Sequence, residues 1–420
     1  MDKILIHGGR PLSGSIKVSG SKNSALPILA ATLLTREQCT IRRVPDLSDT
    51  HYMLQILAFL GAQVERASGT VSITADKATS VAPYDVVRKM RASVCVLGPL
   101  LGRCKEATVS MPGGCVIGDR PIDLHLKGFE ALGAAVRVEG GNIKVFAPRL
   151  KGAIIDLHGK FGPTVLGTDN VMMAAVLADG ITVIEGAAQE PEVVDLANFL
   201  NAMGAKIEGA GTHRLIIEGV PELHGAEHEI IPDRIEAGTF LVAGAICGKG
   251  VTIKRVEPGH LQAITAALSN CGYPVTVGRE SITISPNGQS KPLELKTEPY
   301  PGFPTDMQAQ MCALLSTTEG VSTVTEGIFP QRYMHVAELK RMGAQVELEG
   351  PTAIIRGVDR LLGAPVMASD LRASAALVLA GLKADGITEV SRVYHIDRGY
   401  EHLDEKLREL GAEIERVNAS

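Results

Sequence analysis

The chain has 420 residues, of which 45% are hydrophobic and 21% charged, and its formal net charge is −5. This length predicts two or three domains, and the apolar fraction is sufficient for a large core. Because nucleic-acid-binding domains usually carry a strongly basic face, the mild acidity argues against a nucleic-acid partner. No apolar run approaches the roughly 18 residues of a membrane-spanning helix. The first residues lack the basic-then-apolar pattern of a signal peptide, so no membrane association is expected.

Cysteine usage predicts the compartment. The chain has seven cysteines, an odd number, and most of them stand in apolar surroundings, as at Cys95, Cys247 and Cys312. Free cysteines in such surroundings behave as small buried hydrophobic residues. Disulfides form mainly in oxidising compartments. We therefore expect a cytoplasmic protein without disulfides.

An internal repeat is the main organising feature of the sequence. Six glycines recur at intervals of about 70 residues, each after an apolar stretch and before a short run typical of a β-strand. They are Gly61, Gly133, Gly204, Gly272, Gly343 and Gly411. A glycine in this place is typical of the residue after a helix, where a positive φ angle is needed. The pattern predicts six units of similar fold.

Each unit has the same predicted order of elements. A small-residue helix comes first, as at 23–34 and 371–382, and is apolar nearly all round, which predicts burial. A strand, an amphipathic helix and two short strands follow. The sixth unit lacks its last strand, and residues 3–9 match that strand in type. We therefore expect an α/β fold with two globular domains of three units each, one formed by 22–229 and the other by 1–21 with 230–420.

Polar residues precede each predicted buried helix. This place is of interest because the N-terminus of a helix offers free N–H groups that bind anions. These residues are Lys22 with Asn23, Arg91, Thr168 with Asp169, Asp233 with Arg234, Asp306, and Arg372. The acidic ones have a simpler interpretation as N-caps, which we favour for Asp233 and Asp169. A cation at this place opposes the helix dipole. Lys22, Arg91 and Arg372 therefore indicate a functional requirement, and we expect these helix ends to converge between the domains.

The segment 111–125, MPGGCVIGDRPIDLH, is rich in glycine and proline and predicts an irregular, mobile surface loop. It contains Cys115 close to Arg120, and a neighbouring positive charge lowers the pKa of a thiol from about 8.5 and makes it reactive. The alternative is an incidental exposed cysteine.

A second cluster lies in the C-terminal half, where Asp306, Arg332, Arg372 and Arg398 each stand in a short loop or at a helix start. Arginine binds carboxylate and phosphate groups through two parallel hydrogen bonds, although a lone arginine is usually a solvated surface residue. His224 and His228 have helical spacing but no evident third ligand, so we expect a surface turn and no metal.

Five segments carry a resemblance to a known family: SGSKNSALP, PGGCVIGDRPIDLH, FPTDMQAQ, DLRASAALVLAG and YHIDRGYE. They closely resemble the bacterial enolpyruvyl transferases that act on UDP-N-acetylglucosamine, and the resemblance covers essentially the whole chain. It implies two domains of three βαβαββ repeats around buried helices, an inside-out α/β barrel arrangement that closes on substrate. It implies transfer of the enolpyruvyl group of phosphoenolpyruvate to the sugar 3′-hydroxyl with release of phosphate. That reaction is the first committed step of peptidoglycan precursor synthesis, and it serves cell wall biogenesis, cell shape and cell division without a cofactor.

The resemblance also implies roles for individual residues. The catalytic residues are Cys115, Asp306, Lys22 and Arg398: Asp306 is the base, and Cys115 is the proton donor, which also forms an adduct with phosphoenolpyruvate and reacts with the antibiotic fosfomycin. Phosphoenolpyruvate contacts are implied for Lys22, Arg120 and Arg398 at the phosphate and for Arg332 and Arg372 at the carboxylate. The nucleotide-sugar contacts are Asn23, Arg91, Arg120, Pro121, Ile122, Asp123, Leu124, Asp306 and the backbone of Ile328.

One segment departs from the family pattern. Many relatives have a Ser-Val-Gly-Ala-type loop after the lysine equivalent to Lys160, whereas this chain reads KFGPTVLGTDN. A helix start still follows, so anion binding there can persist through residues 164–167.

Two rival functions are open. The first is the shikimate-pathway enolpyruvyl transferase, which has the same fold and donor but lacks the loop with Cys115. The second is a catalytically silent paralogue that binds a nucleotide sugar as a sensor or scaffold. The presence of base, thiol and cations together argues against the second.

Overall fold

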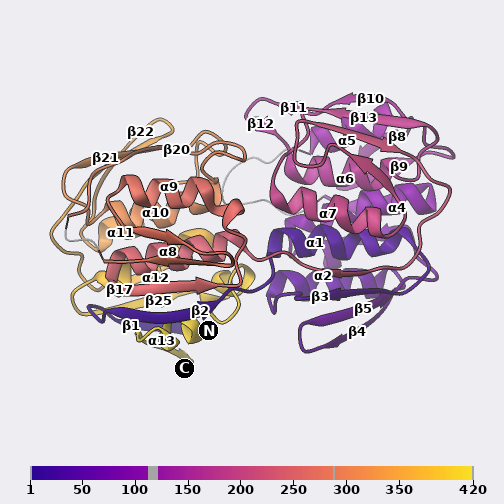
Figure 1. Ribbon diagram of the computed structural model, residues 1–420. Helices are drawn as coiled ribbons and strands as arrows, with labels where there is room; N and C mark the ends of the chain where they lie inside the picture. The colour runs from indigo at the N-terminus through magenta and orange to yellow at the C-terminus, as the bar shows by residue number, and fades with distance from the viewer. Residues whose placement is uncertain (1, 112–121, 287–288, 419–420) are drawn as a thin grey trace. The chain divides into compact units, whose positions relative to one another are not determined.

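The computed structural model describes residues 2–111, 122–286 and 289–418. Contacts within the chain divide it into two compact units. The chain passes from one unit to the other between Ser19 and Gly20 and returns between Ile231 and Pro232. We call the described residues from 20 to 231 the central unit, and those from 2 to 19 and from 232 to 418 the terminal unit (Figure 1). Each unit has its own continuous hydrophobic core.

The interior of each unit consists of helices that pack on one another (Figure 1). Their residues are small and apolar, so nearly every side chain is buried, as the sequence predicted. In the central unit they are α1 (Lys22–Ala31), α4 (Leu97–Cys104) and α6 (Val165–Ala175). In the terminal unit they are α8 (Arg234–Cys247), α10 (Gln308–Leu315) and α12 (Leu371–Lys383).

A second set of helices buries one face only, in agreement with the predicted amphipathic helices. In the central unit they are α2 (Ser48–Phe59), α5 (Asp123–Ala131) and α7 (Pro191–Ala202), with the short α3 (Tyr84–Val87). In the terminal unit they are α9 (Gln262–Asn270), α11 (Met334–Arg341) and α13 (Leu403–Glu409). Short 3-10 helices are η1 (Thr32–Leu34), η2 (Arg91–Val96), η3 (Pro258–Leu261), η4 (Thr305–Met307) and η5 (Val393–Arg398).

Four-stranded sheets repeat a single pattern, a parallel edge pair followed by two antiparallel strands. The central unit has β16 (Glu227–Glu229)–β3 (Cys39–Arg42)–β5 (Thr70–Thr74)–β4 (Gln63–Ala67) and β6 (Val81–Ala82)–β7 (Glu106–Ser110)–β9 (Asn142–Phe146)–β8 (Ala135–Glu139). It also has β10 (Ile154–Asp156)–β13 (Ile181–Glu185)–β15 (Arg214–Glu218)–β14 (Lys206–Glu208) and the hairpin of β11 (His158–Gly159) and β12 (Gly162–Pro163).

The terminal unit repeats the pattern. Its sheets are β2 (Leu12–Lys17)–β17 (Gly248–Lys254)–β19 (Ser281–Ile284)–β18 (Val275–Val277) and β20 (Glu294–Lys296)–β21 (Val321–Thr325)–β23 (Thr352–Arg356)–β22 (Gln345–Glu349). The last is β24 (Pro365–Met367)–β25 (Ile387–Ser391)–β1 (Asp2–His7)–β26 (Glu413–Asn418).

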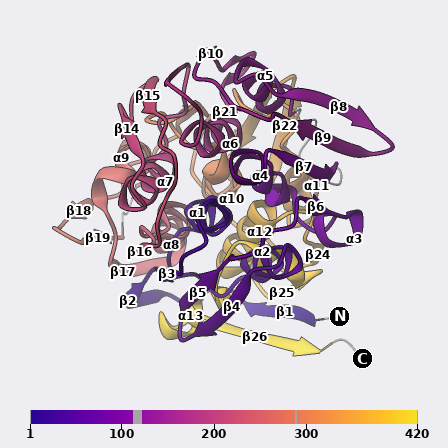
Figure 2. The same ribbon diagram turned by 90° about the vertical axis from the view of Figure 1, so that its right-hand side faces the viewer.

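The N-terminal strand completes the sixth repeat, which confirms the prediction from residues 3–9. Strand β1 pairs antiparallel with both β25 and β26, so that Ile4 lies opposite Val390 on one side and Arg416 on the other. Figure 2 shows β1 and β26 side by side. The central unit closes in an analogous way, because β16 at its C-terminal end pairs with β3 near its start. The sequence did not predict this second closure.

The six recurring glycines have φ angles between +91° and +101°, as expected for residues that end a helix. Three other sequence-based expectations were wrong. Asp169 is no N-cap but lies inside α6, where Thr164 is the cap. Residues 123–125 are not irregular, because α5 begins at Asp123. His228 lies in β16, where its Nε2 is 2.8 Å from Oδ1 of Asp195, and not in a surface turn.

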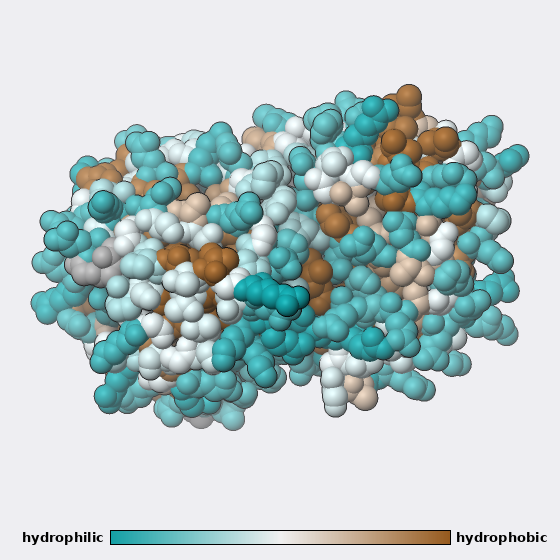
Figure 3. Space-filling model, viewed as in Figure 1, coloured by the Kyte–Doolittle hydropathy of each residue, from teal (hydrophilic) through white to brown (hydrophobic). Residues whose placement is uncertain are grey.

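Polar residues cover most of the face in Figure 3, and apolar residues appear there as separate areas. No helix in the described ranges is long and apolar enough to cross a bilayer. The described cysteines are all free thiols, and Cys95 and Cys312 are fully buried.

Candidate functional site

In the central unit, Lys22 begins α1 and is paired with an acid. Its side chain is 10% exposed, and Nζ lies 3.3 Å from Oδ2 of Asp49, which is 2% exposed and stands in the first turn of α2. A buried lysine at a helix N-terminus is unfavourable alone, and the neighbouring carboxylate offsets its charge. Asn23 follows on α1 and is half-buried. The predicted placement of both residues at a helix start is confirmed.

Arg91 begins η2, which packs against α1 and α6, and its side chain is half-buried. Ile122 immediately precedes α5 and is buried, whereas Asp123 is exposed in the first turn of that helix and Leu124 is half-buried. A negative side chain in the first turn suits the helix dipole. Three of the predicted residues, Cys115, Arg120 and Pro121, lie outside the described residues.

Asn170 joins η2 and α5, and the sequence analysis did not single it out. It is fully buried on α6, its Nδ2 lies 3.0 Å from the carbonyl of Val94 in η2, and its Oδ1 accepts a hydrogen bond of 2.9 Å from the N–H of Gly98. Nδ2 also lies 2.9 Å from Nδ1 of His125 on α5. One amide thus links α6 to η2, α4 and α5. The signal available in the sequence was a single amide, after Thr168 and Asp169, in a helix whose other residues are apolar.

Lys160 lies in the turn of the β11–β12 hairpin, and α6 begins soon after that hairpin. The hydroxyl of Thr164 accepts a hydrogen bond of 3.2 Å from the N–H of Gly167. That N–H is therefore satisfied by the cap, and anion binding through residues 164–167 remains a prediction for the other backbone groups.

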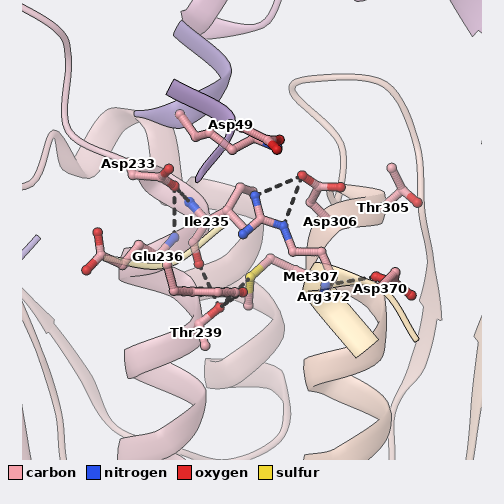
Figure 4. A network of polar contacts seen from close by, with 12 residues as sticks. Asp49, Asp233, Ile235, Glu236, Thr239, Thr305, Asp306, Met307, Asp370 and Arg372 are labelled. Atoms are coloured by element: carbon pink, nitrogen blue, oxygen red, sulfur yellow. Dashed lines mark hydrogen bonds and ion pairs between the residues drawn. The ribbon is translucent and has the colours of Figure 1, made fainter. Parts of the chain in front are cut away.

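In the terminal unit, Asp306 is held by two arginines, of which Figure 4 shows Arg372. Nη1 of Arg332 lies 2.8 Å from Oδ1 of Asp306, while Nε and Nη2 of Arg372 lie 3.2 and 3.1 Å from Oδ2. The side chains of Arg332 and Arg372 are 7% and 1% exposed, and that of Asp306 is 25% exposed. The structure brings these three predicted residues together from separate elements: Asp306 lies in η4, Arg332 in the loop before α11, and Arg372 in α12.

Both guanidinium groups remain protonated and positively charged at neutral pH. Burial by itself lowers the pKa of each arginine, but the surrounding groups outweigh this effect. For Arg332 the carboxylates of Asp306, Asp370 and Glu326 raise the pKa above its ordinary value. For Arg372 the pKa is raised mainly by Tyr400 and Asp306. Asp370 also caps α12 by accepting hydrogen bonds from the N–H groups of Arg372 and Ala373.

Glu326 organises the loop beside this cluster, and the sequence analysis did not single it out. It is 1% exposed, and its Oε1 accepts hydrogen bonds of 3.0 Å from the N–H groups of both Ile328 and Phe329. Its Oε2 lies 3.0 Å from the hydroxyl of Thr305, the residue before Asp306. Because the N–H of Ile328 is already bonded, the contact predicted for its backbone cannot come from that N–H in this conformation.

Arg398 is the last residue of η5, which packs against α12, the helix that carries Arg372. Its side chain is half-buried. Burial lowers the pKa of the nearby His395, and the positive charge of Arg398 lowers it further. Among the residues that the structure describes, no group of three or more His, Cys, Asp or Glu side chains is arranged to hold a metal ion.

Comparisons with known proteins agree on one family. The family model described as EPSP synthase (3-phosphoshikimate 1-carboxyvinyltransferase) matches residues 6–407. Proteins named UDP-N-acetylglucosamine 1-carboxyvinyltransferase from Akkermansia muciniphila and Methylacidiphilum infernorum are 60% and 59% identical, and each match covers 99% of both chains.

Solved structures agree in fold. The enolpyruvyl transferase NikO from Streptomyces tendae is 27% identical with a TM-score of 0.90, over 100% of this chain and 99% of that one. EPSP synthase from Acinetobacter baumannii is 18% identical with a TM-score of 0.75 over the whole of both chains, which shows a shared fold. The chain therefore belongs to the enolpyruvyl (1-carboxyvinyl) transferase family and is a transferase with that family's α/β fold.

Proposed function

We propose that the protein transfers the enolpyruvyl group of phosphoenolpyruvate to the 3′-hydroxyl of UDP-N-acetylglucosamine and releases phosphate. This reaction is the first committed step of peptidoglycan precursor synthesis. The names of relatives that are 59–60% identical over the full length support this choice of acceptor. The observation on the molecule that carries the proposal is Asp306, held between two buried guanidinium groups and still 25% exposed.

The reaction is an addition followed by an elimination. The sugar hydroxyl adds to the central carbon of phosphoenolpyruvate, a base takes the hydroxyl proton, and the methylene carbon accepts a proton, which gives a tetrahedral ketal. The C–O bond to phosphate then breaks, and the methyl group loses a proton to restore the double bond. Such chemistry needs a positioned base and acid. We assign the base to Asp306 and the proton donor to Cys115, and we expect the same thiol to form a pyruvate adduct and to react with fosfomycin.

The substrates require several cations. Together they carry roughly five negative charges, and one opposite-charge pair at about 4 Å is worth about 4 kcal/mol at an effective dielectric constant near 20. We assign Lys22, Arg120 and Arg398 to the phosphate of phosphoenolpyruvate, and Arg332 and Arg372 to its carboxylate. In support, Nη1 of Arg372 is buried and has no hydrogen-bond partner within the described part of the chain. A buried N–H group without a partner is costly unless a ligand satisfies it.

The remaining predicted contacts belong to the nucleotide sugar. We assign Asn23, Arg91, Asp306, Ile328 and residues 120–124 to it. Closure of residues 22–229 against the remainder of the chain, with the loop of Cys115 over the substrates, is the conformational step that we propose for excluding water. Small-angle scattering with and without UDP-N-acetylglucosamine tests it: we expect compaction on binding, and an unchanged radius of gyration would contradict closure.

A phosphate-release assay with each acceptor tests the function. We expect turnover with UDP-N-acetylglucosamine, loss of turnover after treatment with fosfomycin, and no turnover with shikimate 3-phosphate. The reverse acceptor preference would establish the shikimate-pathway activity instead. Cys115→Ser and Asp306→Ala should each lower kcat by about 100-fold or more, the usual contribution of a positioned acid or base. If the wild-type protein binds the nucleotide sugar but shows no turnover, the result would favour the alternative of a catalytically silent sensor or scaffold.

The biological setting follows from this reaction. We propose that the protein acts in the cytoplasm, where its absence would halt cell wall synthesis and disturb cell shape and division. Depletion of the protein should cause accumulation of UDP-N-acetylglucosamine and loss of its enolpyruvyl product in cell extracts. Unchanged pools of both compounds would contradict this role.

A further inference from the structure

Asp306 is anchored at its main chain as well as at its carboxylate. Gln310, two residues into α10 and fully buried, donates a hydrogen bond of 2.9 Å from Nε2 to the carbonyl oxygen of Asp306. The same Nε2 lies 3.1 Å from the hydroxyl of Tyr400 and 3.2 Å from Oγ1 of Thr239 on α8. A side-chain amide therefore joins Asp306 to two buried hydroxyl groups.

Tyr400 also contacts the guanidinium group of Arg372, which binds the carboxylate of Asp306. Its ring centroid lies 5.1 Å from Cζ of Arg372, a distance typical of a cation–π contact, and its side chain is almost fully buried. Tyr400 thus contacts the guanidinium that binds the carboxylate and the amide that binds the carbonyl of one residue. These contacts form a closed circuit from the Asp306 carboxylate through Arg372, Tyr400 and Gln310 back to the Asp306 backbone.

The donors in this circuit can be assigned. Oγ1 of Thr239 lies 2.8 Å from the carbonyl of Ile235, one turn earlier on α8, and that carbonyl only accepts (Figure 4). A hydroxyl has one hydrogen, so Thr239 must accept from Tyr400, whose oxygen lies 2.9 Å away. The Tyr400 oxygen then accepts from Gln310. The two hydrogens of that amide face three oxygens, those of the Asp306 carbonyl, Tyr400 and Thr239, so the two buried hydroxyl groups share one of them.

We propose that Tyr400 is a positioning residue for the reaction: it fixes the guanidinium of Arg372 and thereby the direction of the Asp306 carboxylate. The inference rests on the proposed function, in which Asp306 takes the hydroxyl proton. A phenylalanine would fill the same apolar space without the need to satisfy a buried hydroxyl. Burial of three polar side chains between helices costs free energy, the more so because Oε1 of Gln310 has no hydrogen-bond partner among the described residues, and the proposal gives the Tyr400 hydroxyl a role beyond packing.

The test compares Tyr400→Phe with Tyr273→Phe. Tyr273 is also buried in the terminal unit and hydrogen-bonded through its hydroxyl to Ser290, and we assign it no role in the reaction. We expect Tyr400→Phe to lower kcat by about tenfold, the effect of one buried hydrogen bond, while both KM values stay within about twofold. The acid limb of its pH profile should move to higher pH, because a loosened Arg372 stabilises the carboxylate less. Tyr273→Phe should match the wild type in all three measurements.

A double-variant cycle and crystal structures complete the test. Because Gln310 and Tyr400 act in one circuit, Gln310→Met combined with Tyr400→Phe should lose less activity than the product of the single losses. A Tyr400→Phe enzyme with the kcat and pH profile of the wild type would overturn the inference. If the wild type itself fails to turn over UDP-N-acetylglucosamine, the proposed function fails, and crystal structures decide on the positioning role. A displaced Arg372 in the variant would support it, and an unchanged contact with Asp306 would overturn it.

Discussion

Arg372 places both Nε and Nη2 near a single oxygen of Asp306, Oδ2, at 3.2 and 3.1 Å. The other oxygen, Oδ1, is held by Arg332 at 2.8 Å. Each carboxylate oxygen is therefore bonded to a guanidinium group, and the charge of one aspartate is shared between two buried cations. This arrangement joins η4 to α12 and makes the cluster important for stability as well as for the proposed chemistry.

Asp306→Asn should destabilise the protein because it leaves two buried guanidinium groups without their shared carboxylate. Breaking a buried ion pair costs about 3–5 kcal/mol, and the partial exposure of Asp306 places the expected loss near the lower end, about 3 kcal/mol. Urea denaturation measures it. Combining the change with Arg372→Met should cost less than the sum of the two single changes. Strict additivity would mean that the two residues are not coupled.

The change Lys22→Met distinguishes two contributions of Lys22: binding of phosphoenolpyruvate and stabilisation of the central unit. Loss of the cation removes a proposed phosphate contact, so kcat/KM for phosphoenolpyruvate should fall by about 100-fold, the scale of a lost charged hydrogen bond in a buried site. The same change leaves the buried Asp49 without this partner and should lower the urea midpoint. Adding Asp49→Asn should restore the midpoint but leave kcat/KM low. Recovery of activity in the double variant would contradict a role of Lys22 at the substrate.

His335 should make stability depend on pH. It is 1% exposed on α11, and burial lowers its pKa to about 4, below the value of 6.5 for an exposed histidine, while Asp370 raises this pKa and Arg332 lowers it, each by less than burial does. The unfolded state therefore binds a proton at a pH where the folded state does not. This contribution is fully present above pH 6.5 and is lost as the pH falls toward 4. Between pH 7 and pH 5 it should lower the free energy of unfolding by about 2 kcal/mol.

The variant His335→Leu isolates this contribution from that of the carboxylates. Urea denaturation at both pH values should give a difference between pH 7 and pH 5 that is about 2 kcal/mol smaller in the variant than in the wild type. Equal differences in the two proteins would show that His335 does not carry the pH dependence.

Two glycines on α4 make a matched pair for testing how closely α4 and α6 pack. A Cβ atom at Gly98 would lie 2.3 Å from the backbone oxygen of Asn170, whereas one at Gly102 would lie 3.4 Å from its nearest neighbour. Gly98→Ala should therefore lower the free energy of unfolding by about 2 kcal/mol or more, since backbone must shift. Gly102→Ala should be neutral or stabilise by up to about 1 kcal/mol, because alanine favours helix. Thermal unfolding of both variants measures this, and equal effects would contradict the close approach.

Local signals in the sequence predicted the repeat and its elements. The recurring glycines marked the helix ends because few other residues tolerate a positive φ angle, and the small apolar runs marked the inner helices. The strand at 2–7 could be assigned to the sixth unit because its alternation matched the missing strand. The edge strands β6, β16 and β24 were not predicted, since two or three residues are too short to show a period.

The sequence by itself determined the order of elements, the buried helices and the acidic and basic residues that stand at their starts, because these follow from periodicity and backbone preference over a few neighbouring residues. Only the tertiary structure decided that Asp306 meets Arg332 and Arg372, that Asn170 ties α6 to η2, and that Gln310 and Tyr400 complete a circuit around the aspartate. Within that circuit, Gln310 and Tyr400 are separated by 90 positions along the chain. No local pattern encodes such contacts, since packing of the helices brings these side chains together.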